Sequence, residues 1–227
     1  METTTCGLPI APGTAYVAPL MADGVPAILP LSLLEAVQNI DTPPDDGLGA
    51  LEHELAAKRF GLSATVAAQV ARYRERAQGG DDVPEEEVLA VFRLVGRRPD
   101  AALVYADAGR RAARFAARRL GGGSRALAAA TPGRVGDALN LRLAGRLARR
   151  WLQADLRPSD GLARCELENS LAMQARDDGV ACAFYPAALA ELLRLVADLE
   201  GAMVHQSCRS RGDRSCVWRA TRTEGYE

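Results

Sequence analysis

Three cysteines and a histidine near the carboxy-terminal end of the chain have side chains that bind transition metals. Cys182 stands before a segment with helical spacing, and Cys216 opens the last strand-like segment. Between them, His205 and Cys208 lie at the end of another such segment, so chain reversals could bring all four together. Three thiolates and one imidazole form a complete tetrahedral ligand set for Zn²⁺, with no open position. We therefore predict a structural zinc that joins the helix to the hairpin and keeps its sulfurs deprotonated.

The alternative is a redox-inert core, because cysteine is often a small buried hydrophobe. The spacing is not that of two close Cys-x-x-Cys pairs. A regular strand would also send His205 and Cys208 to opposite faces unless the chain kinks between them. We expect Cys165 to be a buried core residue, because it falls on the apolar side of an alternating segment. Cys6 belongs to neither group. An odd number of cysteines, five, argues against a disulfide framework.

The elements that must position these residues are predicted from the spacing of apolar side chains. Helices are expected over Leu48–Phe60, Ala64–Ala77 with Ser63 as N-cap, Pro84 to about Gly96, Asp100–Leu120, Pro132–Gln153 and Phe184–Asp198. Strands are expected over Ala163–Asn169, Leu171–Ala175, Ala202–Ser207 and Ser215–Thr221, with a turn over Arg209–Asp213. Helices followed by an antiparallel sheet with a packed helix predict an α+β domain.

Length and charge suggest one domain preceded by an acidic segment. A chain of 227 residues is expected to form a single core, which we place at 48–227. Residues 1–57 contain eight acidic side chains and no Lys or Arg, so the rest of the chain carries a net charge of +7. We predict that residues 1–47 form an irregular acidic arm, with one short strand at Ala15–Pro19. No charged signal segment or apolar run of about 20 residues was found, which favours a cytoplasmic protein without a membrane span.

The segment from the first of these cysteines onward resembles the 4-vinyl reductase domain. The matching positions are Cys182, His205, Cys208, Gly212, Asp213, Cys216 and Trp218, together with the upstream Leu167-Glu168-Asn169-Ser170 and the helical Asp107-Ala108-Gly109-Arg110. Motif-level similarity covers about residues 160–220, is weaker from about 100, and is missing over residues 1–50. Sensor members of that family carry a glutamate where this chain has His205, and both side chains can ligate zinc.

The resemblance implies an α+β ligand-binding fold, shared with nitric-oxide-signalling and Golgi-transport proteins, that holds a structural zinc. Standalone members belong to bacteriochlorophyll biosynthesis and photosynthesis, as 4-vinyl reductases or substrate carriers. The expectation is therefore a zinc-stabilised binding protein for a hydrophobic small molecule, most specifically a chlorophyll-type tetrapyrrole intermediate. Its partners would be a pigment-biosynthesis enzyme or a regulator. The alternative is a ligand- or redox-sensing module that acts through a protein partner.

Binding is favoured over catalysis because the sequence offers no recognisable source of hydride. It has no Gly-x-Gly-x-x-Gly after a strand. The glycine run Gly121-Gly122-Gly123-Ser124 follows a helix and is better explained as a helix stop than as a phosphate cradle. A closed zinc site cannot activate water. If the chain is an enzyme, the resemblance implies a divinyl chlorophyllide 4-vinyl reductase.

Candidate ligand-binding residues lie on the predicted helices. They are Phe115, Leu143, Leu147, Trp151, Phe184, Tyr185, Arg111 and Arg114, each with plain core or solvated surface as the alternative. Residues 97–150 contain 13 Arg against three Asp, a charge that suits a carboxylate ligand. Few aromatic residues accompany the arginines, so no nucleic-acid partner is expected. Neighbouring acidic and basic regions favour a homodimer. His53 could bind a pigment magnesium, or simply lie on the surface.

Overall fold

The computed structural model describes residues 24–42, 63–121, 123, 133–160 and 162–222. Its helices are α1 (Ile28–Asp41), α3 (Ala64–Gly79), α4 (Glu85–Val95), α5 (Ala101–Arg118), α7 (Gly133–Leu147), α8 (Leu171–Ala175) and α9 (Phe184–Ala197), with the shorter η2 (Ala148–Leu152), η3 (Val180–Ala183) and η4 (Arg209–Arg211). Its strands are β1 (Val25–Pro26), β2 (Asp82–Val83), β3 (Leu156–Ser159), β4 (Leu162–Leu167), β5 (Gly201–Ser207) and β6 (Cys216–Arg222). The predicted α+β class is confirmed.

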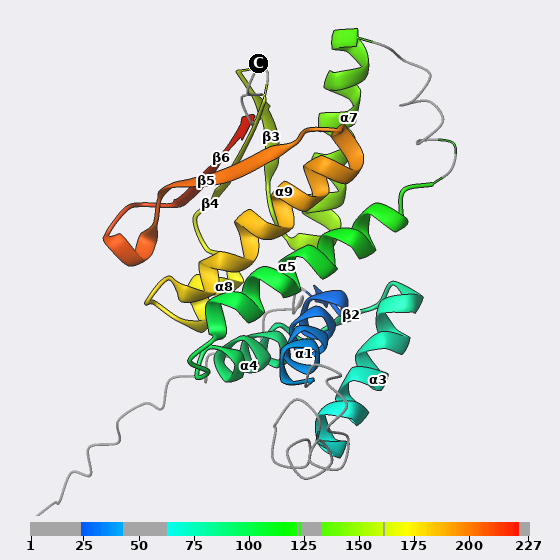
Figure 1. Cartoon of the computed structure of the whole chain (residues 1–227), viewed down its shortest axis with the longest axis vertical. Coiled ribbons are helices and arrows are strands. Elements are labelled where there is room, and N and C mark those ends of the chain that lie inside the picture. The colour runs from blue at the N-terminus through cyan, green and yellow to red at the C-terminus, as the bar shows by residue number, and fades with distance from the viewer. Residues whose placement is uncertain (1–23, 43–62, 122, 124–132, 161, 223–227) are drawn as a thin grey trace, which may run out of the picture.

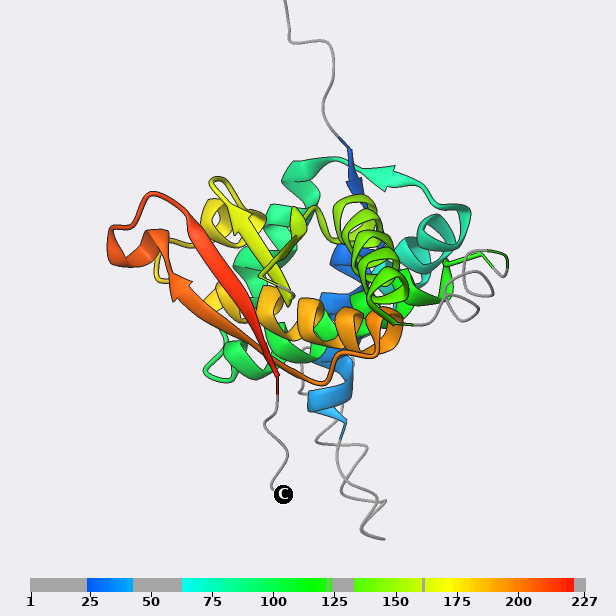
Figure 2. The same ribbon diagram turned by 90° about the horizontal axis from the view of Figure 1, so that it is seen from above.

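A four-stranded antiparallel sheet in the order β3-β4-β6-β5 forms one side of the molecule. Helix α9 packs against it, and α5 runs beside α9 on the side away from β5, with α1, α3 and α4 beyond (Figures 1 and 2). The sheet turns Cys165, Trp218 and Met203 toward the helices, and all three are buried. The core therefore extends from the sheet, through α9 and α5, to α1.

Small residues allow α5 and α9 to approach closely. A Cβ atom at Gly109 would lie only 2.3 Å from the carbonyl oxygen of Phe184. Ala108, Ala112 and Ala116 on the same helix are completely buried. These side chains add little thickness to the contact, so the start of α9 is held directly against α5.

The amino-terminal region corrects one prediction. Residues 28–41, assigned to an irregular arm, form α1, which packs against α5, α3 and α4. Leu29, Leu33 and Ala36 are completely buried. The apolar run Ile28–Val37 hides the periodicity of this helix, because a helix buried on most sides lacks a polar face. The predicted strand at Ala15–Pro19 and helix at Leu48–Phe60 lie outside the described residues.

The other predicted helices agree closely with the structure, apart from the carboxy-terminal end of the helix predicted over Pro132–Gln153. The side chain of Ser63 caps α3 by accepting a hydrogen bond from the Val66 N–H at 3.3 Å. Helix α7 becomes π-helical at Ala148 and ends at Leu152. Only the second half of its apolar stripe faces the core. Val135, at the start of the stripe, is 70% exposed, whereas Leu143 and Leu147 are buried.

Two errors concern the segments that flank β4. The predicted strand Leu171–Ala175 is wrong, because these residues form α8, with Ser170 as N-cap. Five residues are too few to distinguish helical from strand spacing. Strand β3 was not predicted, and its backbone pairs with β4 from Leu156↔Cys165 to Ser159↔Leu162. Only one of its four residues is buried, so it shows almost no hydrophobic pattern.

The stretch Val180–Ala197 is long and apolar enough to cross a membrane by length and composition. Half of this stretch is buried inside the protein, where α9 packs between α5 and the sheet. Burial in a core explains the same composition.

Candidate metal centre and arginine groove

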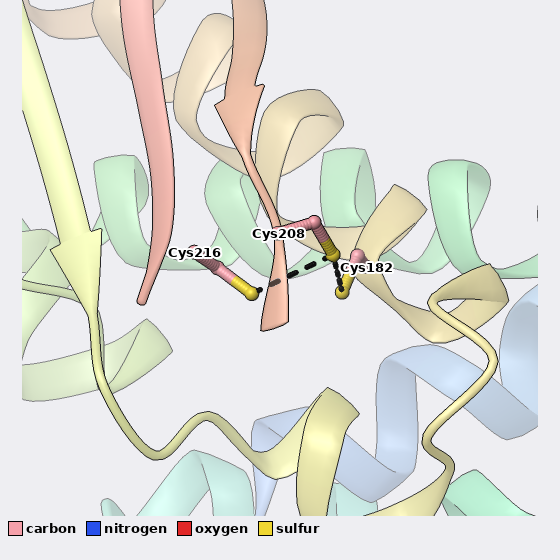
Figure 3. A group of neighbouring side chains, drawn as sticks. All are labelled: Cys182, Cys208 and Cys216. Carbon is pink, nitrogen blue, oxygen red and sulfur yellow. Dashed lines mark hydrogen bonds between the residues drawn. The ribbon is translucent and has the colours of Figure 1, made fainter. Parts of the chain in front are cut away.

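Three chain segments bring Cys182, Cys208 and Cys216 together at one end of the sheet. Cys182 lies in η3 immediately before α9, Cys208 follows β5, and Cys216 is the first residue of β6 (Figure 3). The Cys208 Sγ lies 3.9 Å from the Cys182 Sγ and 3.8 Å from the Cys216 Sγ. All three sulfurs lie within 4.8 Å of one another, and all three residues are buried. The group can hold a metal ion.

A β-bulge turns Cys208 toward the other sulfurs. His205 pairs with Trp218, but Ser207 pairs with Val217, so Gln206 is an extra residue opposite β6. In a regular strand His205 and Cys208 would face opposite sides. The extra residue restores both to the side that faces the helices. The kink that the zinc hypothesis requires is present.

His205 does not join the cysteine group in the described structure. Its imidazole stacks on the indole of Trp218, with the ring centroids 4.7 Å apart and the planes at 15°. Its Nε2 is buried and has no hydrogen-bond partner among the described residues. Of the four predicted ligands, the structure brings the three cysteines together and places the imidazole of His205 against Trp218 instead. The buried Nε2 of His205 nevertheless lies on the same face of the sheet as the Cys208 sulfur.

The loop after β5 presents hydrogen-bonding groups to the sulfurs of Cys208 and Cys216. The Ser210 Oγ lies 3.0 Å from the Cys208 Sγ, and the Arg209 N–H donates to the Cys216 Sγ with a nitrogen–sulfur distance of 3.5 Å. The Cys208 N–H donates to the Asp213 carboxylate at 2.7 Å, which fixes the loop. The loop therefore presents polar groups to sulfur, as is appropriate where thiolate charge must be stabilised.

Gly179 leaves the space that this loop occupies. Its φ of +77° favours glycine, and a Cβ atom there would lie 2.5 Å from the Ser210 Oγ and 3.7 Å from the Cys208 Sγ. Any larger residue at this position would push against the cluster.

The ionisation of the three thiols differs. Burial raises the pKa of Cys182, and the neighbouring Cys216 and Cys208 raise it further. Burial also raises the pKa of Cys216. For Cys208, burial acts in the same direction, but hydrogen bonds from Ser210 and the two other thiols outweigh it and lower the pKa. Metal binding, which requires thiolates, must therefore displace protons from Cys182 and Cys216 against this raised pKa.

The spacing of the sulfurs fits a metal with thiolate ligands. With a Zn–S bond of about 2.3 Å, two sulfurs of a tetrahedral site lie about 3.8 Å apart. The Cys208 sulfur lies 3.9 and 3.8 Å from those of Cys182 and Cys216, and the remaining pair lies within 4.8 Å. Burial lowers the pKa of His205, which favours the neutral imidazole that a metal requires.

Two nearby residues were not predicted. The Sδ of Met173 in α8 lies 3.7 Å from the Cys182 Sγ, and Ser210 contacts Cys208. Met173 carried no signal, because its segment was predicted to be a strand. Ser210 could have been suspected, since it lies two residues after a predicted ligand in a tight turn.

The predicted ligand-binding residues separate into two groups. Phe184 and Tyr185 belong to the core, where their rings contact Phe92 and Trp218 respectively. Leu143, Leu147 and Trp151 are also buried. The structure does not gather all eight into one pocket.

Arg111, Arg114 and Phe115 do share a site, a surface groove of about 460 Å³ between α1, α3 and α5. The groove is lined by Ile28, Leu31, Glu35, Arg74, Gln78, Arg111, Arg114, Phe115, Arg118 and Arg119. It lies toward the carboxy-terminal half of α5, whereas the cysteines lie at the amino-terminal end of α9 (Figure 1). The groove and the metal centre are separate sites.

Comparison with known proteins gave no relative: no family model, curated protein or solved structure matches the chain.

Proposed function

We propose that the chain is a zinc-stabilised binding protein for a hydrophobic small molecule. The observation that carries this proposal is the buried group of three thiols, whose sulfur separations of 3.8 and 3.9 Å match those of a tetrahedral zinc–thiolate site. Cys182, Cys208 and Cys216 would hold the ion, with His205 as the fourth ligand after its imidazole leaves Trp218. Through its bonds to these residues, zinc would hold η3, the β5–β6 loop and β6 together and stabilise the fold.

The ligand proposed from the motif resemblance is a chlorophyll-type tetrapyrrole with a carboxylate. Support comes from the groove that contains Arg111, Arg114 and Phe115, which combines guanidinium groups with an aromatic ring. Ligand sites usually combine an apolar lining with a few well-placed polar groups. The role as a carrier or accessory in divinyl reduction is proposed from the motif resemblance alone.

The test is native mass spectrometry and elemental analysis of the purified full chain, followed by titration with chlorophyllide. We expect one zinc per chain and a shift in the absorption spectrum of the pigment. Absence of zinc would refute the metal half of the proposal. An unchanged pigment spectrum would refute the tetrapyrrole half. The same native spectra report whether the chain is a homodimer.

A second candidate is a redox-sensing module that acts through a protein partner. It is favoured by the position of the Cys208 sulfur, which lies within 4 Å of two other free thiols. Hydrogen peroxide could take two electrons from a thiol pair to form a disulfide and release the metal. If mild peroxide neither releases zinc nor forms a disulfide, this candidate fails.

A further inference from the structure

The arginine groove carries more positive charge than its surroundings neutralise. Three of its arginines have carboxylate partners: Arg74 pairs with Glu35, Arg111 with Asp107 and Arg114 with Glu191, each at 2.7 or 2.8 Å. Arg118 and Arg119 donate instead to backbone carbonyl groups. Within this described set, five guanidinium groups face three carboxylates, and one of the three, Glu191, is shared with Arg194. Positive charge is therefore in excess in the groove.

The arrangement of α5 concentrates this charge on one side. Arg111, Arg114 and Arg118 follow the spacing of three and four residues that places side chains on one helix face. Arg74 approaches from α3, where its ion pair with Glu35 of α1 crosses the groove. Like charges held this close repel one another, and an anion in the groove would relieve that repulsion.

The position of Arg119 is fixed by its neighbours. Its guanidinium group lies 4.8 Å from the centroid of the Phe115 ring and 5.6 Å from that of Trp151. It also donates to the carbonyl oxygens of Ala77 and Gln78 at the end of α3. Because these contacts orient the group before any ligand arrives, little side-chain entropy would be lost on binding.

Three apolar side chains belong to the lining, together with Glu35 and Gln78. Ile28 and Leu31 of α1 are almost completely buried, and the ring of Phe115 is half-buried beside them. A simple inorganic anion would leave the exposed part of the Phe115 ring without an apolar partner. The groove volume of about 460 Å³ lies in the range of sites for small organic ligands.

We infer that this groove binds a small amphiphile through an anionic head, a carboxylate or a phosphate, with its apolar part against the ring of Phe115. The inference rests on the proposed function only in that the chain binds a small molecule. It states the chemistry that the groove itself selects, an anionic head beside an apolar part, whether or not the molecule is a tetrapyrrole, and it is independent of zinc. Arg118 contacts the head directly, and Arg74 closes the groove from α3.

The test is calorimetric titration of the full chain with four probes: octanoate, octyl phosphate, octanol and acetate. Octanoate or octyl phosphate should bind at least tenfold more tightly than octanol, which lacks the charge, and than acetate, which lacks the chain. The stronger of the two anions identifies the head group. Equal affinity for octanol, equal affinity for acetate, or no binding of either charged probe would overturn the inference.

A pair of matched variants locates the site. Arg118→Gln should weaken binding of the preferred anion about tenfold, because a charge-assisted contact is lost. Arg110→Gln changes an exposed arginine of the same helix that does not line the groove, and should leave affinity unchanged. Equal losses in both variants would show that net charge rather than the groove attracts the anion. Zinc content should not change in either variant, so failure here is distinguishable from failure of the metal proposal.

Discussion

The imidazole of His205 lies almost parallel to the indole of Trp218, with ring centroids 4.7 Å apart. Both Nε2 of His205 and Nε1 of Trp218 are buried without a hydrogen-bond partner in the described part of the chain. A buried polar atom without a partner costs about 1–3 kcal/mol. Coordination of a metal by Nε2 would remove one of these two costs, which links the orientation of His205 to occupancy of the thiol cluster.

We therefore predict that His205→Ala weakens zinc binding more than tenfold, because the fourth ligand is lost. Competition with a chelator measures this affinity. Val204→Ala is the control, since Val204 is exposed and lies on the other face of β5. An unchanged zinc affinity in His205→Ala would show that the imidazole only packs on Trp218.

The cysteines provide a second matched comparison. Cys208→Ala should abolish the binding of zinc, because Cys208 lies between the other two sulfurs. Cys165→Ala should retain one zinc per chain and lose only about 1 kcal/mol of stability from a small cavity. Cys165 is completely buried on β4, and burial raises its pKa to about 12, so it is inert at neutral pH. Native mass spectrometry reports both results, and retention of zinc by Cys208→Ala would contradict the proposed site.

Substitution of two glycines distinguishes the cost of backbone strain from the cost of a steric conflict at the cysteine cluster. Gly179→Ala should destabilise the protein by about 2–4 kcal/mol, since it combines a positive φ with a close approach to Ser210. Gly212→Ala has a φ of +90° but open space around the added carbon, and should cost only about 1 kcal/mol. Urea denaturation measures both values. Equal losses would mean that contact with Ser210 contributes nothing.

The pH dependence of stability should depend partly on Glu191. Hydrogen bonds from Arg194 and Arg114 lower its pKa, despite the opposing effect of burial. The stabilisation is therefore fully present above the unfolded-state value of about 4.3 and is lost as pH falls through the lower folded-state pKa. Glu191→Gln should be less stable than the natural sequence by about 1 kcal/mol at pH 7. The difference should shrink steadily below about pH 4.

Denaturation curves at several pH values test this expectation. A difference that stays constant down to about pH 3 would show that Glu191 acts through packing rather than through its charge. Arg93 provides the control, because its contact with Glu86 at 3.8 Å is exposed on both sides, and Arg93→Gln should change stability little at any pH.

Local signals predicted those parts of the fold where side chains alternate between core and solvent. Ser63 before an amphipathic stretch predicted the start of α3 within one residue. The two strands around the loop at Arg209 were found for the same reason. Helix α1 was missed because burial on most sides removes the polar face that sequence analysis looks for, and α8 because five residues contain little more than one turn.

The metal centre was predicted only in part, for physical reasons that concern His205. Residue type and order placed three thiols at one end of the sheet, and the bulge at Gln206 turns Cys208 toward the other two. The direction of the imidazole depends on a stacking partner, Trp218, which lies 13 residues away in sequence. The arginine groove was likewise visible only through Arg111, Arg114 and Phe115, because Arg74 and Ile28 reach it from other helices.

Because β5 contains an extra residue, the face on which Cys208 lies depends on the number of residues between it and His205. Deletion of Gln206 alone would move the side chain of every residue that follows it, up to the turn, to the opposite face of the sheet. The sulfur of Cys208 would then point outward, although all three cysteines remained in the sequence. Insertion of one residue elsewhere between His205 and Cys208 would do the same. The chemistry of this end of the molecule thus depends on the number of residues in a strand as much as on their identity.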